Sequence, residues 1–195
     1  DFRPEYAELF RLRAALGLHI PVCAYTATLT PRDRGNVVEN LGMNKHATFE
    51  LSVNRPNIFL ARHQYDASDQ GVSILEDVIE QLLAFRANCP RHLIFTCTKD
   101  LVRVLAMAMA QRIGQHDAKT DGVARVNWYH AGLCDEARRA IMKDFGLADS
   151  EIRALCSSNA LGMGSDLLCL YIIMGIDPPV DLEDWMQQIG RAGRD

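Results

Sequence analysis

The sequence predicts an α/β fold in which helices cover both faces of a parallel sheet. Short apolar runs of strand length alternate with amphipathic helical stretches over most of the chain, at a spacing typical of βαβ units. Of the 195 residues, 48% are hydrophobic and 24% are charged. This is the balance of a globular protein with a sizeable core, and it excludes disordered and low-complexity classes.

The first elements are predicted in the N-terminal quarter. Residues 20–26 form a short apolar run of strand length. Thr30 has the features of a helix N-cap, because a proline follows it at the first helical position and Asp33 completes a capping-box pattern. Gly42 predicts the end of that helix. No helix or strand is predicted over residues 43–60, which contain a proline that disfavours a helix, so we expect a domain boundary there.

Predicted strands and helices alternate regularly in the rest of the chain. Apolar residues recur on one face of a predicted helix over residues 72–83. The polar stretch 114–122 is predicted to be a loop. Four further strands and three further helices are expected: strands at 92–97, 125–129, 152–156 and 169–174, and helices at 101–113, 135–145 and 182–189.

The charge argues against a strongly basic nucleic-acid coat protein, since the formal net charge is −4. The cations are 17 arginines and 4 lysines, and arginine is the better residue for bidentate phosphate contacts. The acidic excess is local. Residues 144–195 hold three arginines and nine acidic residues, whereas the rest of the chain is slightly positive.

Nothing in the sequence predicts a membrane segment or a metal site. The longest apolar run, residues 167–176, has ten residues, and a transmembrane helix needs about 20. The first residues contain acids and no apolar core of a signal peptide, so we expect an intracellular protein. The six cysteines form no C-x-x-C pair, and we expect them to be reduced and mostly buried.

The C-terminal run QQIGRAGRD, residues 187–195, is the strongest chemical signal. Arg191 and Arg194 are three residues apart with glycines beside them. Planar guanidinium groups match phosphate oxygens, and glycine lets the backbone approach a ligand closely. From chemistry alone, a phosphate site and a solvated basic turn remain equally good interpretations.

Two other motifs follow predicted strands. Residues 160–166, ALGMGSD, form a glycine-rich turn of the kind that binds ligands in doubly wound folds, or simply a tight loop. They are not a dinucleotide fingerprint, because Leu167 stands where the third glycine would be. In YHAGL, residues 129–133, His130 is more simply a structural hydrogen-bonding residue than a catalytic one.

In this order and spacing, YHAGL, GMGSD and QQIGRAGRD resemble the second motor domain of RecQ-type DNA helicases. Four upstream runs also resemble elements of that family: DFRPEY at 1–6 (the segment after the Walker B box), AYTAT at 24–28 (motif III), NRPNI at 54–58 (the element leading into the second motor domain) and LIFTCTK at 93–99 (motif IV). The resemblance covers nearly the whole chain. It implies a RecA-like fold, with residues 1–50 as the end of the first motor domain and residues 51–195 as the second.

The resemblance also implies site residues for ATP-dependent 3′–5′ unwinding of DNA in recombination and repair. Arg191 and Arg194 match the motif VI arginines, which would face the γ-phosphate as arginine fingers do. The nucleotide-binding residues implied are Gln187, Gly190, Asp166 and Gly164, and the nucleic-acid contacts implied are Arg3, Thr26, Thr28 and Ser158. The cofactor would be ATP with Mg²⁺. The partners would be DNA and a first RecA-like domain, and the location would be intracellular, in the nucleus of a eukaryote.

The sequence lacks the ATP-binding half of such a motor. None of its lysines follows a glycine, so it contains no P-loop. Asp135 and Glu136 resemble a DExx box but open a predicted helix, where acids complement the helix dipole. We therefore expect the isolated chain to be inactive.

The glycine-rich turn also departs from the family pattern. Asn159 replaces an aliphatic residue, Leu161 an aromatic one and Ser165 an isoleucine, and Leu167-Leu168 replaces a Lys-Pro pair. A degenerate or partial copy that binds nucleic acid or a protein partner is the alternative function.

Overall fold

The computed structural model describes residues 8–17, 19–26, 29–43, 45–52, 54–64, 73–116, 125–162, 167, 170–176 and 181–193. The chain divides into two compact units, residues 1–55 and 56–195.

Two helices make up the regular structure described in the first unit, α1 (Leu9–Leu16) and α2 (Pro31–Asn40). The predicted N-cap of α2 is confirmed, because the Thr30 hydroxyl accepts a hydrogen bond from the Asp33 backbone N–H at 3.2 Å. Gly42 ends the helix as predicted, with φ of +58°. The Gly42 N–H donates to the Glu39 carbonyl, and the next N–H along the chain donates to the Val38 carbonyl.

The strand predicted at residues 20–26 is wrong. The structure gives these residues no regular secondary structure, and among the described residues of the first unit none forms a strand that could pair with them. An apolar run extends into a strand only where a neighbouring backbone satisfies its N–H and C=O groups. Helix α1 was not predicted from the sequence.

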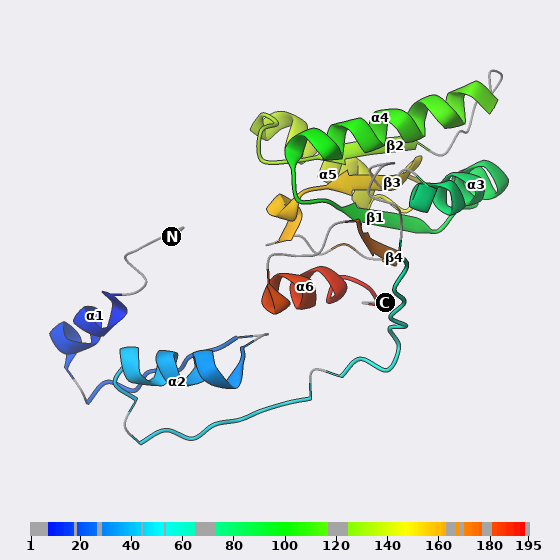
Figure 1. The fold of residues 1–195 in the computed structure, drawn as a ribbon. Helices are drawn as coiled ribbons and strands as arrows, with labels where there is room; N and C mark the ends of the chain where they lie inside the picture. The colour runs from blue at the N-terminus through cyan, green and yellow to red at the C-terminus, as the bar shows by residue number, and fades with distance from the viewer. Residues whose placement is uncertain are drawn as a thin grey trace. The chain divides into compact units, whose positions relative to one another are not determined.

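The second unit contains a parallel sheet of four strands (Figure 1). Their order across the sheet is β2-β3-β1-β4. All three pairs of neighbours are parallel, with Ile94 of β1 opposite Cys156 of β3 and Met174 of β4. The strand bounds are β1 (Arg91–Phe95), β2 (Arg125–Tyr129), β3 (Ile152–Ser157) and β4 (Leu170–Gly175). The four predicted strands of this unit and their parallel arrangement are therefore confirmed.

Helices pack on both faces of this sheet, as predicted. The side chains of alternate residues along β1 point to opposite faces, so Ile94 packs with α3 and α4, whereas Leu93 and Phe95 pack with α5. The helix bounds are α3 (Glu76–Phe85), α4 (Lys99–His116), α5 (Asp135–Gly146) and α6 (Leu182–Ile189). Short 3₁₀ turns occur at Ser73–Leu75, Arg86–Asn88 and Asn159–Gly162.

The two faces hold separate apolar clusters. The cluster under α3 and α4 includes Leu82, Leu105 and Met109, all at most 1% exposed. The cluster under α5 includes Phe145 and Leu155, both fully buried. Each side chain of this size contributes about 1.5–3 kcal/mol when it is fully buried, so the two clusters provide the main stabilisation of the unit.

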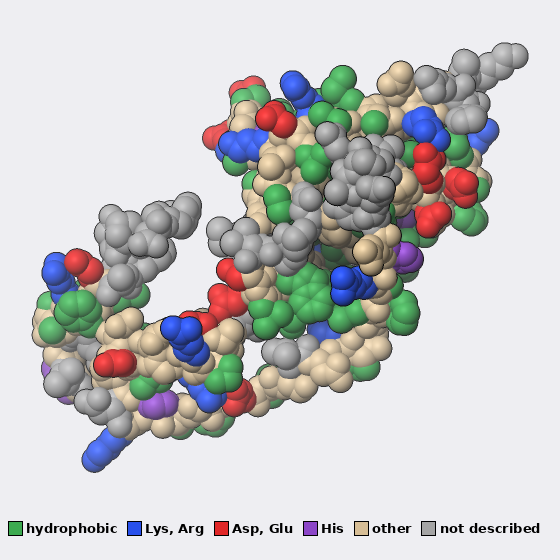
Figure 2. All heavy atoms as spheres, viewed as in Figure 1, with side chains coloured by type: hydrophobic (Ala, Val, Ile, Leu, Met, Phe, Trp, Pro, Cys, Tyr) green, Lys and Arg blue, Asp and Glu red, His purple; other side chains and the backbone are tan. Residues whose placement is uncertain are grey.

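Charged side chains of both signs are interspersed on the face of the second unit shown in Figure 2. Acidic side chains gather over α3, where Glu76, Asp77 and Glu80 lie within its first turn and a half. Arg112 of α4 balances part of this charge through an ion pair of 2.8 Å with Glu76. In the part of the chain that the structure describes, no helix is long and apolar enough to cross a membrane.

Candidate nucleotide and nucleic-acid site

The carboxyl ends of β1, β2 and β3 are joined by hydrogen bonds that continue beyond the strands. The Thr96 N–H donates to the Ser157 carbonyl at 2.9 Å, and the Ser158 N–H donates to the Tyr129 carbonyl at 3.3 Å. Because all the strands are parallel, these ends lie at one edge of the sheet. This is the edge where open α/β sheets bind ligands.

Ser158, a predicted nucleic-acid contact, follows β3 at this edge and is 9% exposed. Its hydroxyl oxygen accepts a hydrogen bond from the Ala160 N–H at 3.4 Å. Its carbonyl accepts from the Ser157 hydroxyl at 2.8 Å and from the Leu161 N–H at 3.2 Å. The backbone of Ser158 is therefore fixed by the sheet on one side and by the 3₁₀ turn on the other.

Helix α6 precedes the GRAGR run and determines how that run begins. Asp181 caps the helix by accepting from the Asp184 N–H at 2.7 Å. Gly190 ends it by donating its N–H to the Met186 carbonyl at 2.9 Å. A Cβ atom at position 190 would lie 2.9 Å from that carbonyl oxygen, too close for any side chain. The glycine is therefore required by the helix end itself, whatever it contacts in a ligand.

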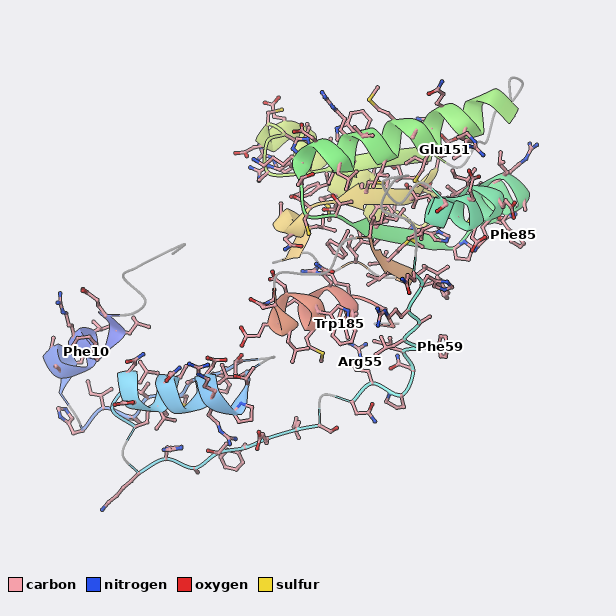
Figure 3. The ribbon with its side chains drawn as sticks, viewed as in Figure 1. Phe10, Arg55, Phe59, Phe85, Glu151 and Trp185 are labelled. Atoms are coloured by element: carbon pink, nitrogen blue, oxygen red, sulfur yellow. The ribbon has the colours of Figure 1, made fainter. Side chains whose placement is uncertain are left out.

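The described residues of motif VI differ in exposure. Arg191 is only 5% exposed, and its N–H donates to the Gln188 carbonyl at 3.2 Å. Gln187 is exposed and Gln188 is buried, so the two adjacent glutamines face opposite ways. Trp185, on the same helix, is 37% exposed (Figure 3). The predicted nucleotide-coupling residue Gln187 is thus available at the surface, whereas Arg191 is buried.

A polar contact between α6 and the turn after β3 was not predicted. Asn159 donates from Nδ2 to Asp184 Oδ2 at 3.2 Å and accepts at Oδ1 from Gln188 Nε2 at 2.9 Å. The one sequence signal for it was Asn159 itself, a polar residue where the RecQ pattern has an aliphatic one. Through this contact the structure brings Ser158 and α6 into one connected region.

Five of the predicted site residues lie outside the described part of the chain: Arg3, Thr28, Gly164, Asp166 and Arg194. Thr26 is described and exposed, and it belongs to the first unit. The roles predicted for all of these residues remain predictions.

His130 and Asp135 have structural roles, as predicted. His130 Nδ1 accepts the Gly132 N–H at 3.1 Å, and its carbonyl accepts the Leu133 N–H, so the residue closes the turn between β2 and α5. Asp135 lies in the first turn of α5 and pairs with Arg138 one turn later. That pairing raises the pKa of the Arg138 guanidinium.

The cysteines are partly as predicted. The five described cysteines are free thiols. The expectation that they are mostly buried is wrong. Cys89 and Cys156 are buried, but Cys23, Cys97 and Cys134 are exposed because they lie in a segment without regular structure or in loops at strand ends.

Comparison with known proteins identifies the family to which these motifs belong. Residues 73–195 match the model of the helicase conserved C-terminal domain. The chain belongs to the helicase C-terminal domain family. Its curated relatives confirm the RecQ resemblance. It is 33% identical over its whole length to the protein named "Probable ATP-dependent DNA helicase RecS" of Bacillus subtilis, and 28% identical to the ATP-dependent helicase SGS1 of Saccharomyces cerevisiae.

Solved structures confirm the fold of this helicase C-terminal domain. S. cerevisiae Dbp5 bound to RNA and ADP BeF3 superposes on 85% of the chain, 40% of its own length, with a TM-score of 0.61 and 19% identity. Mss116p bound to single-stranded RNA and AMP-PNP superposes on 64% of the chain, 23% of its own length, with a TM-score of 0.53 and 17% identity. At such identities the likeness shows a RecA-like fold alone.

The helicase C-terminal domain is one part of these longer proteins. The chain spans 36% of the length of RecS and 12% of that of SGS1. This agrees with the absence of a P-loop from its sequence.

Proposed function

We propose that this chain is the C-terminal motor half of a RecQ-type, ATP-dependent 3′–5′ DNA helicase. Such a helicase would use ATP hydrolysis to move along one strand and unwind duplex DNA in recombination and repair. The supporting observation is that the turn after β3 and helix α6, which carries Gln187 of motif VI, contact each other through Asn159, next to Ser158 at the carboxyl edge of the sheet. A first motor domain with a P-loop would be needed for activity.

In this proposal the nucleotide lies against the GRAGR run. Arg191 and Arg194 stabilise the negative charge that develops on the γ-phosphate during transfer. Gln187 is exposed and available to the nucleotide. Gly190, Gly164 and Asp166 complete this side of the site. Arg191 is buried in the structure, so its guanidinium would have to become accessible when a first motor domain brings the phosphates to it.

The residues present fit one half of an ATP site. Arginines and glycines suit phosphate oxygens, whereas the lysine that reaches the β- and γ-phosphates and the acidic residue that holds Mg²⁺ are lacking from the recognised motifs. ATP with Mg²⁺ would supply the transferable phosphoryl group. This chain's residues would position it and neutralise its charge, while most of the phosphate and metal contacts come from the first domain.

The proposed nucleic-acid contacts are Ser158, Thr26, Thr28 and Arg3. Ser158 supports this role by its position at the edge of the sheet, where its own backbone is rigidly held. Single-stranded DNA and duplex junctions are the proposed substrates, and the first RecA-like domain is the proposed protein partner. The location would be intracellular, and the nucleus in a eukaryote.

The test joins this chain to the first motor domain of RecS and measures ATP hydrolysis with and without single-stranded DNA. We expect DNA to stimulate hydrolysis in the joined protein. Arg191→Ala and Arg194→Ala should each lower the stimulated kcat by roughly 1,000-fold or more, the effect of an arginine finger. Arg112→Ala is the matched control, because it removes an exposed arginine whose ion pair with Glu76 joins α3 and α4, outside the site.

The same experiment tests the alternative of a non-catalytic remnant. If both arginine variants hydrolyse ATP as the unmodified protein does, the arginine-finger roles are wrong. If the joined protein shows no DNA-stimulated hydrolysis at all, the helicase proposal fails. Binding of the chain to single-stranded DNA without ATP, weakening linearly on a log–log plot against salt, would then favour a nucleic-acid-binding remnant.

A further inference from the structure

The turn after β3 holds α6 at two points one helical turn apart. Asp184 and Gln188 are at positions i and i+4 of α6, so their side chains lie on the same face of the helix. Asn159 contacts both of them, at 3.2 and 2.9 Å. Two contacts separated along the helix axis restrict both its rotation and its sliding, which one contact could not do.

The direction of these hydrogen bonds follows from the chemistry of the three side chains. A carboxylate only accepts, so Asn159 must present its amide nitrogen to Asp184. Its carbonyl oxygen then faces Gln188, which must donate from its own amide nitrogen. Gln188 therefore donates to Asn159, and Asn159 donates to Asp184. Reversing either side-chain amide would break these hydrogen bonds.

Of the two hydrogen bonds that Asn159 makes, the one from Gln188 should cost more free energy to lose, because Gln188 is buried. Gln188 is 8% exposed, and Asn159 accepts from its amide. Asn159 itself is exposed. An aliphatic residue at position 159 would leave a buried amide donor without that acceptor, and this costs more than the loss of an exposed hydrogen bond.

The contact also joins the two proposed binding regions. Asn159 follows Ser158 directly, and the carbonyl of Gln188 accepts the N–H of Arg191 at 3.2 Å. We infer that Asn159 is a positioning residue that fixes α6 to the turn after β3, and thereby couples nucleic-acid contact at Ser158 to the placement of Arg191. The coupling part rests on the proposed function.

The fixing of α6 is tested on the chain as it stands, by hydrogen exchange of the backbone amides of residues 185–191. Asn159→Val should speed their exchange by about tenfold. Asn159→Asp should do the same, because it places two carboxylates face to face. Adding Asp184→Asn to Asn159→Asp should restore slow exchange, since the new amide can donate to the new carboxylate while Gln188 keeps its acceptor.

Arg112→Gln is the control for this measurement, since it removes an interaction of similar length between α3 and α4. Equal exchange in the unmodified chain and in Asn159→Val would overturn the inference. If adding Asp184→Asn does not restore slow exchange to the Asn159→Asp variant, the assigned direction of the two hydrogen bonds is wrong.

The coupling is tested in the protein joined to the RecS first domain. Asn159→Val should lower the stimulation of kcat by single-stranded DNA about tenfold and leave the KM for ATP within about twofold. Unchanged stimulation together with faster exchange would refute the coupling and leave a purely structural contact. A joined protein that no DNA stimulates would count against the proposed function alone, because amide exchange decides the fixing of α6 independently.

Discussion

The guanidinium of Arg91 lies over the ring of Phe145, with its central carbon 5.7 Å from the ring centroid. It also donates from Nη2 to the carbonyl of Leu147. Arg91 is 4% exposed and Phe145 is fully buried. A cation held over an aromatic face in a desolvated place contributes about 2 kcal/mol or more, so this pair fastens the end of α5 to the start of β1.

Phe145→Ala should lower the free energy of unfolding by about 3–5 kcal/mol, because it removes a buried ring and the surface on which Arg91 lies. Phe145→Leu keeps much of the apolar volume and should cost less. Urea unfolding followed by circular dichroism measures both. A loss below about 1 kcal/mol for Phe145→Ala would show that the ring is not part of the core.

His92 should make the fold sensitive to acid. It is fully buried in β1, and burial lowers its pKa below the ordinary 6.5, although the carbonyls of Pro90 and Arg153 oppose this. The unfolded chain therefore takes up a proton near pH 6.5 that the folded chain resists, so stability falls as the pH drops below 6.5.

One such proton changes the unfolding free energy by up to about 1.4 kcal/mol per pH unit. Urea midpoints at pH 7.5 and 5.5 should therefore differ more for the unmodified chain than for His92→Gln, which cannot titrate. Equal differences for the two proteins would exclude His92 as a source of acid sensitivity.

Two glycines of the second unit should respond oppositely to alanine. Gly190→Ala places a Cβ 2.9 Å from the Met186 carbonyl oxygen, and we expect a loss of about 1–3 kcal/mol as the backbone shifts. Gly114 lies in α4 with nothing within 4 Å of an added Cβ. Gly114→Ala should stabilise the unit by about 0.5–1 kcal/mol, because alanine is the better helix former. Thermal unfolding of both variants provides the comparison.

The cysteines should separate into two classes of reactivity. Burial raises the pKa of the Cys156 thiol to about 12 and also raises that of Cys89. At pH 8 only about one Cys156 thiol in ten thousand is ionised, and the thiolate is the reactive form. Iodoacetamide followed by mass spectrometry should label the exposed Cys23, Cys97 and Cys134 first. Early labelling of Cys156 would indicate that the sheet opens readily.

The second unit was predictable because its pattern is strong and local. Buried parallel strands such as β1 are short continuous apolar runs, and the helices between them repeat apolar residues on one face. The first unit was less predictable. Helix α2 was found through its Thr30 cap, but none of its described residues is buried. The local sequence does not show whether a neighbouring strand is present, so the apolar run at 20–26 could not be told from a strand.

The candidate site was predictable in its motifs and less so in its geometry. Spacing located the GRAGR run and the turn after β3. It did not show that Arg191 is buried, nor that Gln188 rather than Gln187 faces the interior, because side-chain direction at a helix end depends on the neighbouring element. The link through Asn159 joins residues 29 positions apart, which no local pattern shows.

The Nδ2 of Asn57 donates to the carbonyl of Gly193 at 3.1 Å, across 136 positions of sequence. Residues near the beginning and the end of the described part of the second unit therefore lie beside each other. Residues 57 and 193 can therefore be joined by a short linker, and the unit opened in a surface loop, with little rerouting of the chain.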